Sequence, residues 1–220
     1  MPFQALHSWR VTAQEAIAIQ DSLRDQVVRE DRFGAIKTVA GIDVGFEDGG
    51  GVTRAAVVVL RYPELELAET AVIRRPTTFP YIPGLLSFRE GPAVLEAIDR
   101  LRALPDLLIC DGQGFAHPRR LGLACHLGLW TGLPSIGAAK SRLIGQHESI
   151  GEKRGDWQPL WDAGELIGAA LRTRPGAKPL YISTGHRIGL ETAIGMVLAC
   201  TRAYRLPEPT RQAHRLASLE

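Results

Sequence analysis

The sequence predicts a mixed α/β fold, in which an antiparallel three-stranded meander is continued by parallel strands and flanked by helices. Two observations predict it: three β-like runs follow one another between residues 36 and 74, and helical and strand-like segments alternate after residue 88. A chain of 220 residues with 45% hydrophobic residues buries enough surface for one core. We therefore expect residues 1–220 to form a single domain.

The first elements are a helix and the meander. Thr12 begins the helix with a capping box, since Glu15 stands three residues later, and apolar residues then recur at helical spacing to about Glu30. The β-like runs span 36–46, 54–62 and 65–74, and the Pro63-Glu64 turn between the last two suits an antiparallel hairpin. The first third of the chain is thus expected to form the antiparallel part of the sheet.

The remaining elements alternate. We expect helices at 88–104, 121–131 and 190–203 and after Pro209, with strands at 107–110, 135–139, 165–172 and 179–183. Such alternation indicates parallel pairing through crossover helices. The polar, glycine-bearing stretch 145–162 is expected to be a mobile surface excursion. Together these elements describe an RNase H-like mixed sheet.

Composition excludes several classes. Three widely spaced cysteines without a CxxC pair argue against a disulfide framework or a structural zinc site and favour a reducing compartment. The longest apolar run is far shorter than the ~20 residues that cross a bilayer, and the first ten residues lack an apolar signal core. The sequence thus predicts a cytoplasmic protein with no membrane partner and no obligate protein partner. The net charge of +2 excludes a histone-like polycation, although residues 111–220 hold 14 Lys and Arg against 9 Asp and Glu.

Acidic residues stand at strand ends. Asp43 lies inside the apolar run VAGIDVGF, and Asp111 directly follows LLIC, where a carboxylate needs a partner or a metal to offset its desolvation. Glu90 lies near a helix start, and His214 adds an imidazole. Each alone is also typical of a cap or turn, so the prediction depends on their convergence in space. Converged, this oxygen-rich set suits Mg²⁺, or Mn²⁺, better than zinc, and two such ions would activate a water on a phosphodiester.

The segment PYIPG at 80–84 sets Tyr81 between two prolines that stiffen the backbone. A rigid protruding aromatic can wedge between bases in an enzyme that extracts an altered base. The alternative is a proline-rich turn whose tyrosine packs on the domain.

Basic residues follow both later strand ends. His117, Arg119 and Arg120 precede a helix, so their side chains and the helix amides are expected to bind a phosphate near Asp111. Lys140 closes SIGAAK and is expected to reach a scissile phosphate, with a solvated lysine as the alternative. His186, in STGHR, is equally explained as a binding residue or as a cap of its own loop.

These segments resemble endonuclease V, the deoxyinosine 3′ endonuclease family of nucleic-acid repair, over nearly the whole chain. The motifs that carry the resemblance are AGIDVGF at 40–46, VTRAAVVVL at 52–60, PYIPGLLSFRE at 80–90, DGQGFAHPRRLGLACHLG at 111–128, SIGAAKSRL at 135–143, GHRIGLETA at 185–193 and YRLPEPTR at 204–211. PYIPG with FRE and DGxGxxHPR is a specific combination.

The resemblance implies an RNase H-like fold, divalent-metal dependence, and hydrolysis of the second phosphodiester bond 3′ to a deaminated purine, leaving 3′-OH and 5′-phosphate ends. It implies that Asp43, Glu90 and Asp111 bind the metal with His214 as a further neighbour, that Lys140 is the active-site lysine and that Tyr81 is the wedge. Contacts to the extruded hypoxanthine are expected from small residues and backbone, at positions Gly84, Leu86, Gly112, Gly122 and Leu123, and His117 is added to this set.

The chain departs from the family pattern at two positions: Gln113 replaces a common histidine, and Gly189 stands where many relatives have serine. Side-chain hydrogen bonds at these positions are therefore open. The alternatives are an inosine-specific ribonuclease, another RNase H-like nuclease that would lack the wedge, and more distantly an actin-like ATPase or sugar kinase, because GIDVG resembles a phosphate loop. Damaged DNA is the expected partner, with single-stranded or inosine-containing RNA as the other candidate, since discrimination of the 2′-hydroxyl is not visible in a sequence.

Overall fold

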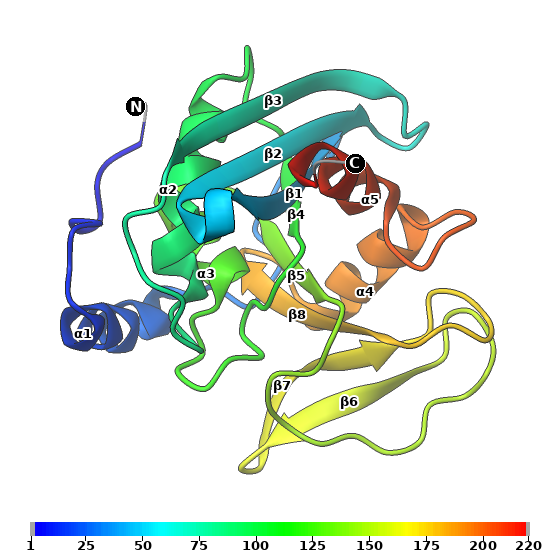
Figure 1. Cartoon of the computed structure of the whole chain (residues 1–220). Coiled ribbons are helices and arrows are strands. Elements are labelled where there is room, and N and C mark those ends of the chain that lie inside the picture. Colours follow the sequence, from blue (N-terminus) through cyan, green and yellow to red (C-terminus); the bar gives the residue numbers. More distant parts are fainter. Residues whose placement is uncertain (1–2, 219–220) are drawn as a thin grey trace.

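The computed structural model describes residues 3–218 and has one mixed sheet covered by helices on both faces (Figure 1). The strands are β1 (Thr38–Glu47), β2 (Val52–Arg61), β3 (Leu67–Pro76), β4 (Leu107–Cys110), β5 (Ser135–Ala139), β6 (Trp157–Asp162), β7 (Glu165–Leu171) and β8 (Leu180–His186). The helices are α1 (Ala13–Leu23), α2 (Leu86–Asp99), α3 (Leu123–Thr131), α4 (Leu190–Ala199) and α5 (Glu208–Ala217), with short 3₁₀ turns at Arg24–Gln26 and Asp48–Gly50.

The sheet has the strand order β3-β2-β1-β4-β5-β8-β7-β6. β1, β2 and β3 form the expected antiparallel meander, and β4 pairs in parallel with both β1 and β5. The RNase H-like mixed α/β sheet is thus confirmed. The expectation of parallel pairing does not extend further, because β8 is antiparallel to both β5 and β7, and β6 is antiparallel to β7. β6, β7 and β8 follow one another through short connections without a crossover helix, and such connections join antiparallel strands.

Alternate residues of the central strands point into two separate hydrophobic cores, one on each face of the sheet. Val39 and Ile109 face α4 and α5, whereas Ala40 and Leu108 face α2 and α3. This period of two is the geometry of an extended strand, and strands apolar on both faces read as continuous hydrophobic runs. The central strands are therefore held rigidly from both sides, and whatever stands at their ends is fixed in place.

Two stretches differ from expectation. The capping box of Thr12 and Glu15 is present, but α1 ends at Leu23 and passes into a 3₁₀ turn instead of continuing to about Glu30. The polar, glycine-bearing stretch expected to be a mobile excursion contains β6, which includes Pro159. Proline is tolerated there because β6 is an edge strand, where a missing N–H breaks no ladder hydrogen bond. Within the described residues, no helix is long and apolar enough to cross a membrane.

Candidate active site

Asp43 and Asp111 lie side by side because their strands are neighbours. Ile42 of β1 pairs in parallel with Cys110 of β4. The next residues, Asp43 within β1 and Asp111 directly after β4, therefore lie at the same level of the sheet. The Asp111 amide donates to the Ile42 carbonyl at 2.9 Å, which continues the ladder one step beyond β4. The two carboxylates are thereby brought together from positions 68 residues apart in the chain.

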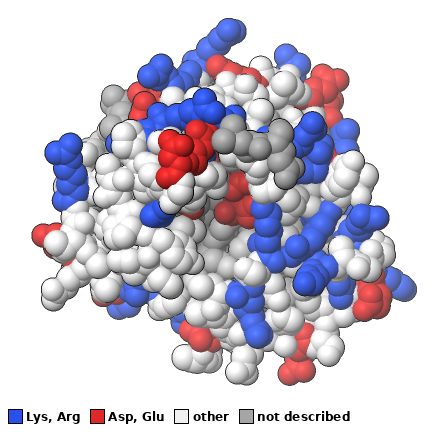
Figure 2. Space-filling model, viewed as in Figure 1, with Lys and Arg blue, Asp and Glu red and all other residues white. Residues whose placement is uncertain are grey.

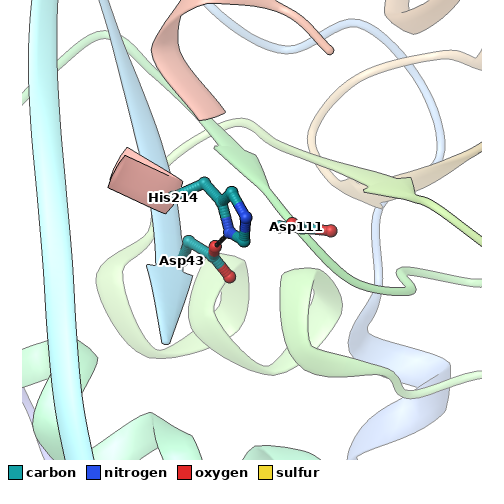
Figure 3. A group of neighbouring side chains, drawn as sticks. All are labelled: Asp43, Asp111 and His214. Carbon is teal, nitrogen blue, oxygen red and sulfur yellow. Dashed lines mark hydrogen bonds and ion pairs between the residues drawn. The ribbon is translucent and has the colours of Figure 1, made fainter. Parts of the chain in front are cut away.

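His214 of α5 completes this group. One ligand atom from each of Asp43, Asp111 and His214 lies within 4.8 Å of the others (Figure 3). The imidazole Nδ1 is 2.6 Å from Oδ2 of Asp43. Helix α5 comes this close to β1 because Gly41 has no side chain, since a Cβ at Gly41 would overlap the backbone of Pro209. Gly41 thus allows α5 to place the His214 imidazole beside the Asp43 carboxylate.

Lys140 joins the same group from the end of β5. Its Nζ lies 2.5 Å from Oδ2 of Asp111 and 3.4 Å from Nδ1 of His214. The Lys140 carbonyl accepts a hydrogen bond at 2.6 Å from Arg205, which also donates to Pro179 at 2.7 Å. Arg205 therefore fixes the strand end that carries the lysine.

Glu90 stands close by but outside the tightest group. It lies on α2, only 7% exposed, and burial followed by the charges of Asp43 and Asp111 raises its pKa well above the usual range. Burial and the charge of Asp43 also raise the pKa of Asp111, although Lys140 acts in the opposite direction. Glu90 and Asp111, whose charged forms are destabilised by burial and by neighbouring carboxylates, form an arrangement that a bound hard cation would stabilise. The donor set, with its oxygens and a single imidazole, fits Mg²⁺ or Mn²⁺.

A cavity of about 370 Å³ opens beside these carboxylates, and both Asp111 and Lys140 line it. All seven residues expected to contact the substrate also line it: Tyr81, Gly84, Leu86, Gly112, His117, Gly122 and Leu123. Tyr81 is 69% exposed, so it protrudes and does not pack on the domain. In Figure 2 acidic side chains lie inside a central hollow, and Lys and Arg gather along its right-hand rim.

One wall of the cavity is held by an unusual hydrogen-bond arrangement, which we call the Gly84 clamp. The carbonyl of Gly84 accepts from Gln20 Nε2 at 3.0 Å, from His117 Nε2 at 3.0 Å and from Arg119 at 2.8 Å. Nδ1 of His117 accepts from the Arg119 amide, so the proton of the neutral ring lies on Nε2. Burial lowers the pKa of His117 to about 4, which keeps the ring neutral at physiological pH. Three donors, one from α1 and two from the segment 117–119, therefore fix the PYIPG loop.

The expected phosphate site at His117, Arg119 and Arg120 is not what the structure shows. Arg119 is bound to Gln20 and Gly84, and Arg120 forms ion pairs with Asp162 at 2.9 Å and Glu165 at 2.7 Å. These cations are neutralised or hydrogen-bonded internally. Sequence reasoning could not foresee these partners, which lie 35 to 99 residues away in the chain.

The structure also shows the contacts of His186, Gln113 and Gly189, whose roles were left open by the sequence. His186 accepts a hydrogen bond from the Val28 amide at 3.2 Å, so it anchors a loop and does not face the cavity. Gln113 donates to the Ser141 carbonyl at 2.9 Å and ties the Asp111 loop to the segment after Lys140. At Gly189, where no side chain can cap α4, the cap comes from Asp31, which accepts from the Gly189 amide at 2.7 Å. Sequence analysis missed Gln20, Asp31 and Arg205, because no local pattern reveals contacts this distant.

A mixed sheet of this topology, with one carboxylate inside β1 and another directly after the adjacent β4, defines the class of RNase H-like metal-dependent nucleases. The endonuclease V family model matches residues 21–215. Endonuclease V of Trichormus variabilis is 57% identical over 213 residues, which cover 96% of each chain.

Solved structures agree. That of endonuclease V from Streptomyces avermitilis is 45% identical, with a TM-score of 0.90 over 96% of this chain and 93% of that one. Ciona intestinalis endonuclease V, bound to DNA that contains an inosine, is 30% identical with a TM-score of 0.83 over 94% of this chain and 97% of that one. The chain belongs to the endonuclease V family and is an endonuclease.

Proposed function

We propose that this protein is a DNA repair endonuclease that recognises a deaminated purine, deoxyinosine above all, and hydrolyses the second phosphodiester bond 3′ to it, leaving 3′-OH and 5′-phosphate ends. The observation that carries the proposal is the continuity of one cavity from the protruding Tyr81 to Asp111 and Lys140. When a base is held in that cavity, the backbone of the strand to which it belongs lies beside the carboxylates.

The cavity is suited to hypoxanthine because glycines and backbone groups make much of its wall. Gly84, Gly112 and Gly122 bring the main chain close to any occupant. Hypoxanthine differs from adenine in carrying a carbonyl and a ring N–H, which backbone donors and acceptors distinguish. Tyr81 then acts as the wedge that fills the space left in the stack, held in place through the Gly84 clamp.

The metal-binding role belongs to Asp43, Asp111 and Glu90, with His214 as the imidazole neighbour. Mg²⁺ is the proposed ion and Mn²⁺ its substitute; when bound, it supplies an activated water and stabilises the leaving oxygen. Lys140 provides a positive charge beside Asp111, where a phosphate oxygen approaches. Together, the metal ion and Lys140 bring positive charge to the phosphodiester bond that is cleaved.

DNA is the proposed substrate because the related Ciona protein is bound to a DNA that contains an inosine followed by a ribo-adenosine. An inosine-specific ribonuclease is the second candidate. We place the protein in the cytoplasm, since its three cysteines are free and buried, as a reducing compartment allows. The whole chain is proposed to work as one domain without an obligate protein partner.

The experiment compares end-labelled duplexes that contain deoxyinosine or deoxyadenosine at one position, with Mg²⁺ and with EDTA. We expect a single nick at the second bond 3′ to deoxyinosine, dependent on Mg²⁺, with ends that DNA ligase reseals. Tyr81→Ala should weaken selection of the lesion, and Tyr81→Phe should retain it because the ring remains. Equal nicking of both duplexes would overturn the base-specific proposal, and faster cleavage of inosine-containing RNA would favour the second candidate.

A further inference from the structure

A second exposed aromatic lies outside the site described so far. Tyr204, in the loop between α4 and α5, is 54% exposed. The guanidinium of Arg211 lies 4.6 Å from the centroid of its ring, in a cation–π contact. Tyr204 is thus held flat against one neighbour while much of its ring stays open to solvent.

Arg211 is itself held in place. Its guanidinium donates to both carboxylate oxygens of Glu208, at 2.7 to 3.1 Å, and Glu208 is only 8% exposed. The charge of Arg211 is therefore balanced within α5, and its contribution is to stiffen Tyr204. An aromatic ring that is already ordered loses little conformational entropy when a planar group stacks on it.

The loop that carries Tyr204 is linked to the active site through Arg211 and Arg205. Arg211 lies three residues before His214 and therefore on the same face of α5. Arg205, the next residue after Tyr204, donates to the carbonyl of Lys140, whose side chain pairs with Asp111. The loop that carries Tyr204 therefore adjoins the part of the site that holds Lys140 and Asp111.

The loops that carry the two tyrosines lie on either side of the central strands. In Figure 1 the loop before α2, which carries Tyr81, lies to one side of β1 and β4, and the loop between α4 and α5 lies to the other. With the altered base in the cavity and the cleaved bond 3′ to it at the carboxylates, a strand that continues in the same direction passes over the α4–α5 loop.

We propose that Tyr204 is a stacking platform for a nucleobase on the 3′ side of the cleaved bond. The polarity of the strand rests on the proposed function. Stacking tolerates any sequence, because every base has a π-face, so this contact contributes affinity without restricting the sequence beside the lesion. Tyr81 and Tyr204 then hold the strand on both sides of the reacting bond.

The test measures the dissociation constant for inosine-containing duplexes whose 3′ or 5′ flank is trimmed stepwise, in the Asp111→Asn background to prevent cleavage. Stacking predicts roughly tenfold weaker binding when the 3′ flank is removed. Tyr204→Ala should bind the long duplex roughly tenfold more weakly and lose nothing more on 3′ trimming. Tyr204→Phe should behave like the parent protein, because the ring is kept.

Leu67→Ala is the matched control, since Leu67 is 57% exposed and is the first residue of the edge strand β3, two strands away from Asp43. A second measurement uses 2-aminopurine at successive positions 3′ to the bond: its fluorescence should be quenched at one position, and the quenching should disappear in Tyr204→Ala. Thermal unfolding of each variant checks that the fold is retained.

Equal 3′-flank dependence in the parent and in Tyr204→Ala, or a loss of affinity confined to 5′ trimming, would overturn the platform. This failure is distinct from that of the proposed function. A wild-type protein that does not select deoxyinosine contradicts the function, whereas one that nicks deoxyinosine and ignores Tyr204 contradicts only the platform.

Discussion

The acidic centre and the adjoining base cavity are held together by opposite kinds of interaction. At the centre, burial and the charges of neighbouring carboxylates raise the pKa values of Asp111 and Glu90, while Lys140 and His214 oppose this at Asp111 and Arg89 opposes it at Glu90. In the cavity, the Gly84 carbonyl is saturated by three donors. The centre carries negative charge that an external cation would stabilise, whereas the Gly84 carbonyl in the cavity wall is hydrogen-bonded within the polypeptide alone.

The largest effect should come from removing one charge at the centre. Asp43→Asn preserves the shape of the side chain but removes a metal-binding charge, so the rate of nicking should fall by about 10³-fold or more, ~4 kcal/mol of transition-state stabilisation. Binding to inosine-containing DNA should persist, because the cavity is intact. Single-turnover cleavage and a binding titration measure the two properties, and a variant that still nicks within tenfold of wild type would place the chemistry elsewhere.

Divalent metal should stabilise the centre in the folded protein. Adding Mg²⁺ at about a hundredfold excess over its dissociation constant should raise the free energy of unfolding by up to about 3 kcal/mol. Urea unfolding with Mg²⁺ and with EDTA measures this difference. Asp111→Asn should lose most of the gain and Tyr81→Ala should keep it; equal gains in both variants would show that the ion binds at another site.

Acid should lower the free energy of unfolding through protonation of His117, which lines the cavity. The folded pKa of His117 is about 4, below the ordinary value of 6.5, so the unfolded chain takes up the proton first as the pH falls. The stability contributed by the neutral ring is complete above pH 6.5 and is lost between pH 6.5 and 4, with about 2 kcal/mol lost by pH 5.

Unfolding measured at pH 7.5 and pH 5 tests this for wild type and for His117→Gln, whose amide can still donate to Gly84. Comparing the two proteins cancels the titration of the carboxylates. The variant should lose about 2 kcal/mol less on acidification, and identical losses would contradict the assignment.

The smallest effect should come from a single donor of the clamp. Arg119→Ala leaves Gln20 and His117 on the Gly84 carbonyl, so selectivity for deoxyinosine over deoxyadenosine should fall only about threefold to tenfold, ~1 kcal/mol. Because the donors share one acceptor, Gln20→Ala with Arg119→Ala should lose more than the sum of the single changes. Strict additivity in relative kcat/KM would mean that the donors act independently.

Much of the site could be predicted from the sequence because its signals are local. Asp43 and Asp111 were recognised as carboxylates in or just after apolar strands, and the topology brought them together. Tyr81 was recognised from its flanking prolines, and it is exposed as predicted. The functional roles assigned to these side chains stay predictions until the experiments above are done.

The sequence by itself determined the meander, the central strands and the positions of the acids, since apolar periodicity and backbone stiffness act over a few residues. The tertiary structure decided how the remaining polar groups are used. It turned Arg119 and Arg120 from expected phosphate ligands into internal supports, made His186 an anchor for Val28, and supplied Asp31 as the cap of α4. A buried hydrogen bond between residues a hundred or more positions apart leaves no local trace, because its partners meet only after the sheet has formed.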